Sequence, residues 1–344
     1  MKIIVAPLNW GLGHASRCVP IIKKLKQLGF SPIIASDGNA LNFLQKEFPE
    51  LDSFELPSYK IQYGKNLKLS LLSKFFSIRR TVKNEHKVIA DYISKNDNVV
   101  GIISDNRFGV YHSKMPSVYI THQVKVFAGV FTFFTSFVHQ RIIEKFDELW
   151  IPDDYKINLS GELSNPKSLQ ISHHFIGNLS RLHKEKLHKK WDVTILLSGP
   201  EPRRTHVEEK LIDRFKNTSK KALLIQGKIE KEQKWFQKGN VEIVNFLLSK
   251  ELKQTLNSSE LIIARSGYSS IMDLSCLEKK ALLIPTKGQN EQEYLARHLN
   301  NKFGIQFIIE KEIETLDFEN VEGDSIRKVK TKLEDSLFSL FQSK

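Results

Sequence analysis

Short apolar runs that end in polar loops recur along this chain, and they fall into two successive sets. Runs rich in β-branched residues and too short for helices are typical of strands buried on both faces of a sheet. Helical periodicity follows several runs, as between Ile21 and Leu28, where Gly29 provides a stop. The pattern therefore predicts an α/β fold built in two halves. The expected strands are 2–6, 31–36, 99–104, 115–120 and 147–151, then 192–197, 222–226, 241–245, 261–264 and 281–284.

The last two predicted strands form two strand–loop–helix units in succession. The strand at 261–264 stops at a Ser-Gly turn, and Ser270 with Asp273 forms a capping box that predicts a helix start. The strand at 281–284 ends in a polar loop that leads to a second helix at Gln292. In open α/β sheets, ligands bind at the carboxyl ends of the strands, so these loops are a candidate binding site.

This segment resembles the donor-binding segment of family 28 glycosyltransferases, the MurG-like UDP-sugar transferases. The resemblance implies that Gly267 in the loop lets the backbone approach a nucleotide diphosphate and that Asp273 in the helix holds the ribose hydroxyls. It also implies that Gln292 and Glu293 hold the sugar. The acid of the pair is Glu293 where the family has Gln, and a carboxylate cannot donate hydrogen bonds, so the sugar's identity stays open. The donor-binding residues expected here are Arg265, Ser266, Gly267, Ser270, Asp273, Gln289, Gln292 and Glu293.

Other parts of the chain resemble the same family, which implies a GT-B fold of two Rossmann-like domains facing across a cleft. The implied parts are an acceptor-side domain (1–172), a nucleotide-sugar-binding domain (173–325) and a C-terminal helix (326–344) that packs back on the first domain. The loop after 192–197, with its arginines and a helix start, also has anion-binding chemistry of its own. Further expected donor-side residues are Gly13, Ser198, Gly199, Arg204, Phe246 and Leu247, and expected acceptor-side residues are Arg17, His122 and Gln123.

His14 is the residue expected to carry the chemistry, and Asp105 is expected to orient it. His14 lies at a predicted helix N-terminus, where the dipole disfavours imidazolium and keeps the ring available as a base. Asp105 follows a buried strand and can hold a catalytic imidazole in one tautomer. Without the resemblance, the residues favour a capping or packing histidine at position 14, and they equally allow Asp105 to be a loop cap. A dinucleotide site is also conceivable after the first strand, but Ser16 stands where the fingerprint needs its third glycine.

Length and composition favour a two-domain protein of the reducing cytoplasm. A chain of 344 residues with 40% hydrophobic residues can build two cores. Cys18 and Cys276 make no disulfide framework, and Met1 leads directly into a strand, so no signal peptide is expected. Neither cysteine has metal-ligand spacing and no Asp-x-Asp occurs, so we expect no metal and no cofactor.

The net charge of +13 divides into +7 for residues 1–172 and +6 for residues 173–344. Residues 60–87 hold eight basic residues and one acid, which equals the whole excess of the first half. No nucleic-acid-binding module accompanies them, so a nucleic-acid partner is not expected. Leucines and phenylalanines lie among the bases of 65–87. This pattern fits either a core-packed helix with a cationic outer side or contact with an anionic membrane surface.

The sequence thus predicts an inverting, metal-independent glycosyltransferase that moves a sugar from a nucleotide diphosphate donor, expected to be UDP-linked, to an acceptor hydroxyl. The acceptor is a carbohydrate or a lipid-linked molecule, which would place a cytoplasmic protein at the inner face of the membrane. Three alternatives stay open at this point: a nucleotide-sugar hydrolase, an epimerase on the same scaffold, and a non-catalytic sugar-nucleotide sensor.

Overall fold

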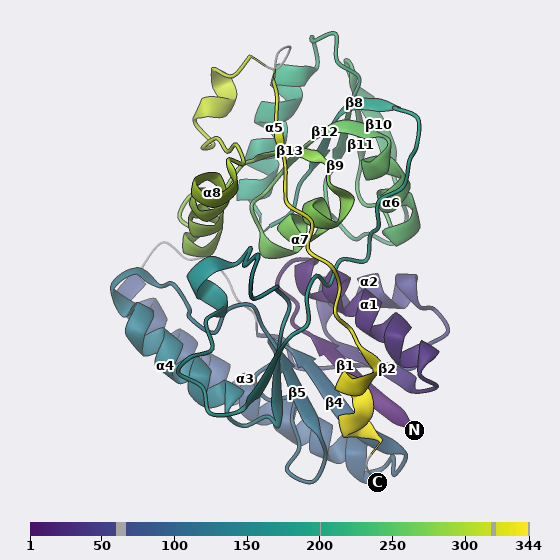
Figure 1. The fold of residues 1–344 in the computed structure, drawn as a ribbon, viewed down its shortest axis with the longest axis vertical. Coiled ribbons are helices and arrows are strands. Elements are labelled where there is room, and N and C mark those ends of the chain that lie inside the picture. Colours follow the sequence, from purple (N-terminus) through teal and green to yellow (C-terminus); the bar gives the residue numbers. More distant parts are fainter. Residues whose placement is uncertain (60–66, 200, 318–320, 343–344) are drawn as a thin grey trace.

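The computed structural model describes residues 1–59, 67–199, 201–317 and 321–342, with the side chains of 67–76 excepted. Two α/β domains lie one above the other, and the chain crosses from the first to the second and back again (Figure 1). Both termini therefore belong to the first domain. This arrangement confirms the GT-B class of fold expected from the sequence.

A parallel sheet forms the centre of the first domain. Across the described residues its strand order is β3-β2-β1-β4-β5-β6-β7, and each of these neighbouring pairs is parallel. The order reverses between β1 and β4, and ligands bind α/β sheets at the carboxyl side of such a switch point. The strands are β1 (Lys2–Pro7), β2 (Ser31–Ser36), β3 (Ser53–Glu55), β4 (Val99–Asp105), β5 (Ser117–Ile120), β6 (Glu148–Ile151) and β7 (Ser172–Phe175), and the helices are α1 (Gly13–Gln27), α2 (Gly38–Glu47), α3 (Leu67–Ser94) and α4 (Thr132–Ile143).

The second domain repeats this plan with antiparallel strands at both edges. In the described part of the chain its order is β10-β11-β9-β8-β12-β13-β14, with β10 and β14 antiparallel to their neighbours. The switch point lies between β8 and β12. The strands are β8 (Trp191–Leu196), β9 (Ala222–Ile225), β10 (Trp235–Lys238), β11 (Val241–Val244), β12 (Ser259–Ala264), β13 (Lys280–Leu283) and β14 (Asp324–Ser325), and the helices are α5 (Arg203–Phe215), α6 (Ser249–Asn257), α7 (Tyr268–Leu277) and α8 (Asn290–Phe303).

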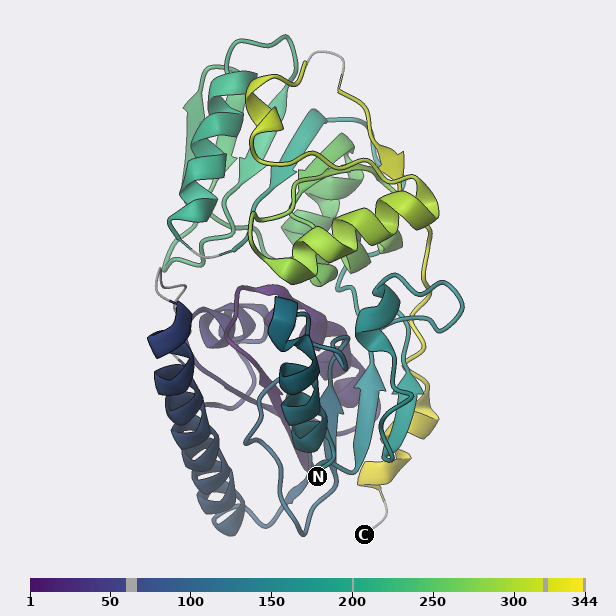
Figure 2. The ribbon, with the colours of Figure 1, turned by 90° about the vertical axis from the view of Figure 1, so that its left-hand side faces the viewer.

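Two crossing segments join the domains and pair with each other. Gly177, just after β7, forms an antiparallel bridge with Thr331 on the returning segment. The returning segment ends in the short 3-10 helix η4 (Asp335–Phe341), which packs on the first domain (Figure 2). There the ring of Phe338 meets Trp150 edge-on at a centroid distance of 5.2 Å. Both side chains are fully buried, so η4 completes the core of the first domain.

The structure corrects several expectations about the elements. The C-terminal segment is not a helix over 326–344: it is irregular up to Glu334 and helical only in η4. The run 147–151 is not the last strand of the first sheet, because β7 adds a further one and extends that sheet to Phe175. The short or edge strands β3, β7, β10 and β14 carry too few buried apolar residues to give a sequence signal.

The expected capping box at Ser270 is also wrong. Helix α7 begins at Tyr268, two residues before Ser270, and its N-cap is Gly267 without a side-chain hydrogen bond. This helix packs on the sheet and extends beyond its best local cap residue.

We predict that removing the buried ring of Phe338 destabilises the protein. Phe338→Ala should lower the free energy of unfolding by about 3–5 kcal/mol, because it deletes a large side chain from a packed core. Denaturant unfolding at neutral pH measures this change. Phe236→Ala is the matched control: this ring is 44% exposed on the edge strand β10, so its loss should cost only about 0.5 kcal/mol. Equal effects of the two substitutions would contradict the role assigned to η4.

Candidate functional site

The loop after β1 and the end of β4 bring His14 and Asp105 together at the switch point of the first sheet. Asp105 is the last residue of β4 and pairs in register with Pro7 of β1. His14 is the second residue of α1, which starts directly after the loop that follows β1. Its Nδ1 lies 2.7 Å from Oδ1 of Asp105. The residues expected to form a base and its orienting acid are therefore in contact.

Arg17 lies one helical turn beyond His14 and neutralises Asp105. Its Nε donates to Oδ2 of Asp105 at 2.5 Å, and its Nη2 donates to Oδ1. Asp105 is completely buried and Arg17 is 2% exposed, so neither charge is stabilised by water. Burial alone would raise the pKa of this carboxyl, but Arg17 and His14 hold the pKa of Asp105 at about 2. The site therefore contains a fixed negative charge at all physiological pH values.

Two tautomers of His14 are compatible with its neighbours. In one, Nδ1–H donates to Asp105 and Nε2 keeps a lone pair that can accept a proton. In the other, Nδ1 accepts from Nη2 of Arg17, 2.8 Å away, and Nε2 carries the hydrogen. Burial and the charge of Arg17 lower the pKa of His14 below its ordinary value of 6.5, although Asp105 acts in the opposite direction. The ring is therefore neutral near pH 7, and only the first tautomer makes it a base.

The second domain closes directly against this group of residues. The imidazole of His122, just after β5, stacks on the ring of Tyr268 at the start of α7, with centroids 4.1 Å apart and planes 12° from parallel. A Cβ on Gly13 would lie 2.8 Å from Oγ of Ser269. Only glycine lets the start of α1 approach α7 this closely. Two helix N-termini, one from each domain, thus meet at the candidate site.

The expected donor-side residues of β12, α7 and α8 form one connected loop structure. Ser266 donates its hydroxyl hydrogen to the carbonyl of Gln292 at 2.8 Å, and Oε1 of Gln292 accepts from the backbone of Thr286 at 2.9 Å. Oε1 of Glu293 accepts from the backbone of Gly288 at 2.7 Å. The paired residues thus shape the 286–288 loop. Of the others, Gly267 and Gln289 are the N-caps of α7 and α8, and Ser270 is half-buried.

Arg265 and Arg204, two arginines expected on the donor side, are buried and paired with carboxylates of the protein. Arg265 is buried and pairs with Glu310 at 2.9 Å, so it ties β12 to the chain beyond α8. Arg204 is 3% exposed and binds the carboxylates of Glu201 and Glu208. Its neighbour Arg203 is exposed, and its guanidinium contacts the carbonyl of Lys287. Sequence spacing alone could not tell which of the adjacent arginines is accessible, because that depends on the rotation of α5.

Asp273 faces the crossing segment between the domains. Its carboxylate accepts from the hydroxyl of Ser180 at 2.5 Å, and Arg181 lies near enough to favour its charged form. Burial nevertheless raises the pKa of Asp273. Asp273 of the second domain therefore also contacts the segment that crosses between the domains.

The remaining expected residues lie where the two domains approach each other. Ser198 and Gly199 follow β8, with Gly199 exposed at a φ of +111°, a conformation that favours glycine. Phe246 and Leu247 are buried just beyond β11, and the carbonyl of Phe246 accepts from Gln233 at 3.1 Å. Gln123 is half-buried, and its side chain hydrogen-bonds to Glu291 of α8.

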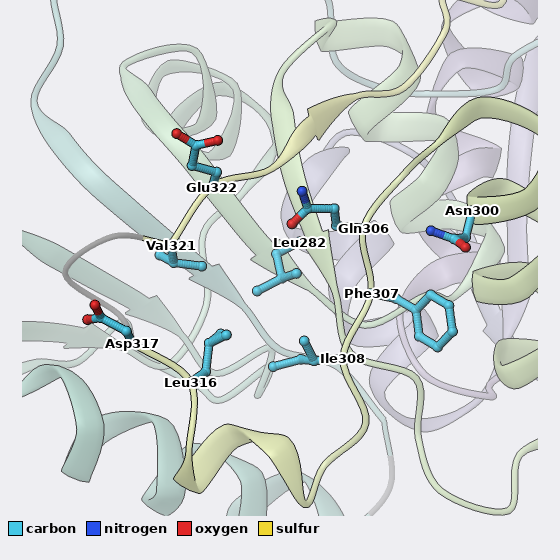
Figure 3. A pocket seen from close by; sticks show the side chains of 9 residues that line it. All are labelled: Leu282, Asn300, Gln306, Phe307, Ile308, Leu316, Asp317, Val321 and Glu322. Carbon is cyan, nitrogen blue, oxygen red and sulfur yellow. The ribbon is translucent and has the colours of Figure 1, made fainter.

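The candidate site is defined by this polar arrangement and not by a surface pocket. A pocket of about 450 Å³ lies in the second domain, between β13, the end of α8 and residues 306–308, 316–317 and 321–322 (Figure 3). None of the expected site residues lines it. Among the described residues, no group of three His, Cys, Asp or Glu side chains is arranged to hold a metal ion.

Comparison with known proteins relates this architecture to sugar transfer. Residues 205–335 match the model of the glycosyltransferase family 28 C-terminal domain. No curated protein sequence matches the chain. The match includes the expected donor-side residues from Phe246 to Glu293, and it begins after Ser198, Gly199 and Arg204.

Solved structures that resemble the chain include glycosyltransferases of low identity, so the likeness shows the fold alone. The calicheamicin glycosyltransferase CalG4 has a TM-score of 0.64 at 8% identity, over 99% of this chain and 92% of that chain. The spinosyn rhamnosyltransferase SpnG, complexed with thymidine diphosphate, has a TM-score of 0.58 at 13% identity, over 92% and 90%. A UDP-glucosyltransferase from Polygonum tinctorium has a TM-score of 0.58 at 10% identity, over 89% and 84%.

We predict that the charge of Asp105 stabilises the fold and that this contribution depends on pH. Asp105→Asn leaves Arg17 buried without its partner and should lower the free energy of unfolding by about 3–5 kcal/mol at pH 7. The folded-state pKa of about 2 lies below the unfolded value of about 3.9. The contribution is therefore complete above pH 4 and is lost as the pH falls towards 2.

Urea unfolding of both proteins between pH 7 and pH 2.5 tests this, because the difference between them should narrow only below pH 4. Asp52→Asn is the control: its carboxylate makes an exposed pair with Lys2 at 3.0 Å, which should contribute about 0–1 kcal/mol. A difference that stays constant down to pH 2.5 would show that the charge of Asp105 is not what stabilises the fold.

Proposed function

We propose that this chain, which has a GT-B fold and matches the family 28 C-terminal domain over residues 205–335, transfers a sugar from a UDP-linked or related nucleoside diphosphate donor to an acceptor hydroxyl, with inversion and without a metal ion. The observation that carries the proposal is the contact of His14 with Asp105 at 2.7 Å, directly beside the start of α7. Direct attack of a hydroxyl on a sugar requires a base that takes the hydroxyl proton beside the donor. The buried His14–Asp105 pair lies at a switch point and faces the domain that matches the family 28 model.

In the proposed reaction the acceptor hydroxyl attacks the anomeric carbon from the side opposite the diphosphate. Its proton passes to Nε2 of His14 as the new C–O bond forms, and the bond to the diphosphate oxygen breaks with its electron pair. Attack from the opposite side inverts the configuration in one step. Asp105 stabilises the imidazolium that results, and the lowered pKa of His14 keeps the ring unprotonated beforehand.

Helix N-termini and one accessible arginine are proposed to stabilise the departing diphosphate. Gly267 caps α7, and Ser198 with Gly199 precedes α5, so both loops can present backbone N–H groups to an anion. Arg204 holds Glu201 and Glu208 and so fixes the start of α5, whereas the exposed Arg203 can supply positive charge. The chain has no Asp-x-Asp sequence of the kind that holds a metal in the other main class of glycosyltransferases.

The nucleoside and the sugar are assigned to the rest of the second domain. We propose that Asp273 holds the ribose hydroxyls, that the chain at Phe246 and Leu247 binds the base, and that Gln289, Gln292 and Glu293 contact the sugar. The structures of SpnG with thymidine diphosphate and of the UDP-glucosyltransferase favour a pyrimidine nucleoside diphosphate. Arg17, His122 and Gln123 are assigned to the acceptor side, where they surround His14.

We predict that His14→Ala abolishes most of the turnover without weakening donor binding. A thermal-shift screen with UDP-sugars and TDP-sugars identifies the donor, because a ligand of the native state raises its stability. With that donor, the substitution should reduce turnover about 10²–10⁴-fold and leave the calorimetric affinity unchanged. In the wild type, turnover should fall only as the pH drops below 6.5, since His14 acts in its neutral form and its pKa is lowered.

His188→Ala is the control, because this histidine is exposed on the crossing segment. Release of free sugar at full rate without any acceptor would instead indicate a hydrolase. A His14→Ala protein that keeps most of its turnover would remove His14 from the chemistry.

We also propose that the acceptor is lipid-linked and that the first domain docks on an anionic membrane. Residues 65–76 of the basic stretch lie outside the residues whose side chains the structure describes. In the described part of α3, Arg79, Arg80 and Lys83 are exposed. The neighbouring helix α4 and the short 3-10 turn η1 (Gly129–Phe131) before it expose a group of large apolar side chains: Val130, Phe131, Phe133, Phe134 and Phe137. No helix among the described residues is long and apolar enough to cross a membrane.

We predict that the protein sediments with vesicles containing phosphatidylserine, but not with neutral vesicles, and that high salt releases it. Each basic residue near an anionic surface contributes about 1 kcal/mol at most, and salt screens this attraction. Changing Phe133 and Phe134 to Ser should abolish binding without loss of stability, because the two rings are 87% and 58% exposed. Wild-type protein that ignores anionic vesicles at low salt would point to a soluble acceptor.

A further inference from the structure

The loop between β1 and α1 exposes a tryptophan beside the proposed base. Residues 8–12 form this loop, and Leu8 at its start is buried. Trp10 is 44% exposed, and Gly11 next to it is exposed as well. Trp10 lies four residues before His14, so their Cα atoms are at most about 15 Å apart. A large aromatic side chain that the core does not cover therefore lies close to the group that is proposed to take the acceptor proton.

Hydrogen bonds to two other strand ends fix the loop that carries Trp10. The backbone N–H of Leu8 donates to the carbonyl of Asp105 at 2.9 Å. The side chain of Asn9 uses both of its ends: Nδ2 donates to Oδ2 of Asp37 at 3.0 Å, and Oδ1 accepts from the backbone of Ala40 at 3.3 Å. The loop therefore keeps its conformation without a ligand, and a ligand that binds to it loses less free energy in ordering the protein.

The chemistry of this loop suits a neutral ring with an apolar face. Residues 8–13 contain no charged side chain. Gly11 has a φ of +69°, and a Cβ built on it would have no atom within 4 Å, so the space next to Trp10 is open. The face of an aromatic ring is electron-rich, so it repels anions such as phosphates and attracts weakly positive C–H groups. A pyranose ring presents C–H groups on its faces and hydroxyl groups around its edge, which matches such a surface.

The start of α1 adds hydrogen-bond donors and places the loop next to the second domain. The N-cap of α1, Leu12, makes no side-chain hydrogen bond. The first N–H groups of a helix have no partner inside it, so those of α1 are suited to the hydroxyl groups of a ligand. Gly13, three residues after Trp10, approaches Ser269 so closely that a Cβ would lie 2.8 Å from its Oγ. Trp10 is therefore a residue of the acceptor-side domain that lies near the proposed donor.

We propose that Trp10 binds the acceptor: the face of its indole stacks on a neutral pyranose ring, and a hydroxyl of that ring reaches Nε2 of His14. The proposal rests on the proposed function and deepens it, because it names a sugar ring as the part of the acceptor that reacts. A lipid-linked acceptor meets this requirement when a sugar forms its reacting end. The donor stays assigned to the second domain, so loss of the indole should weaken acceptor binding and leave nucleotide binding unchanged.

The experiment measures binding of neutral methyl pyranosides to the full-length protein by calorimetry and tryptophan fluorescence, in the presence of UDP. The probes are the methyl glycosides of glucose, galactose, mannose, rhamnose and N-acetylglucosamine, with open-chain glucitol as the control ligand. At least one pyranoside should bind and change the emission, whereas glucitol should not. Trp10→Ala should weaken that binding about 10-fold or more, because the stacking face is removed. Trp10→Phe keeps an aromatic face, so it should retain most of the affinity but lose the change in emission.

Trp235→Phe is the matched control, because Trp235 is 49% exposed on β10, whereas Trp150 and Trp191 are buried. This variant should keep both the affinity for the pyranoside and the change in emission.

Four results would overturn the proposal. They are the absence of pyranoside binding to the wild type, an unchanged affinity in Trp10→Ala, a change in emission that persists in Trp10→Phe, and a loss of UDP affinity in Trp10→Ala, which would place the indole on the donor side. Since no sugar donor is present, none of these results depends on transfer. The His14→Ala turnover measurement answers that question separately.

Discussion

The buried carboxylate of Asp105 is the constraint on which the candidate site depends. A charge without water must be paired and hydrogen-bonded, and Asp105 at the end of β4 has no exposed surface. Arg17 meets this need from α1, and the 15-residue helix is thereby locked to the sheet at its first turn. His14, three residues earlier on the same helix, has no freedom to lie elsewhere. A requirement of electrostatics thus fixes the position of the proposed base.

The same region must also let another domain approach, and two kinds of residue make this possible. Gly13 has no side chain where Ser269 comes close, so the starts of α1 and α7 can nearly touch. His122 and Tyr268 offer flat rings that stack without a polar partner on their faces. The polar edges of these rings are satisfied from both sides of the interface. The result is a contact between domains that is specific in its hydrogen bonding.

Part of the fold and part of the candidate site could be predicted from the sequence, for physical reasons. The buried strands and the polar residues at their ends predicted the fold and placed Asp105 beside the loop of His14, and these two side chains are in contact. Edge strands such as β10, whose side chains are exposed, have no apolar period to detect. Glu291 was missed because its partner His122 is 169 residues away. Arg204 was chosen over Arg203 because local spacing does not reveal which guanidinium two nearby glutamates will bind.

The paired crossing segments have a mechanical consequence. Beside the Gly177–Thr331 bridge, the backbone of Asn178 donates to Lys330 at 3.2 Å and that of Lys332 donates to Ile176 at 2.9 Å. A single connecting segment would leave the relative orientation of the two domains unrestricted. Two connecting segments that are hydrogen-bonded to each other restrict it. Sliding and twisting would break these hydrogen bonds, whereas swinging about the line between the segments would keep them. The paired segments therefore restrict the ways in which one domain can move against the other without loss of these hydrogen bonds.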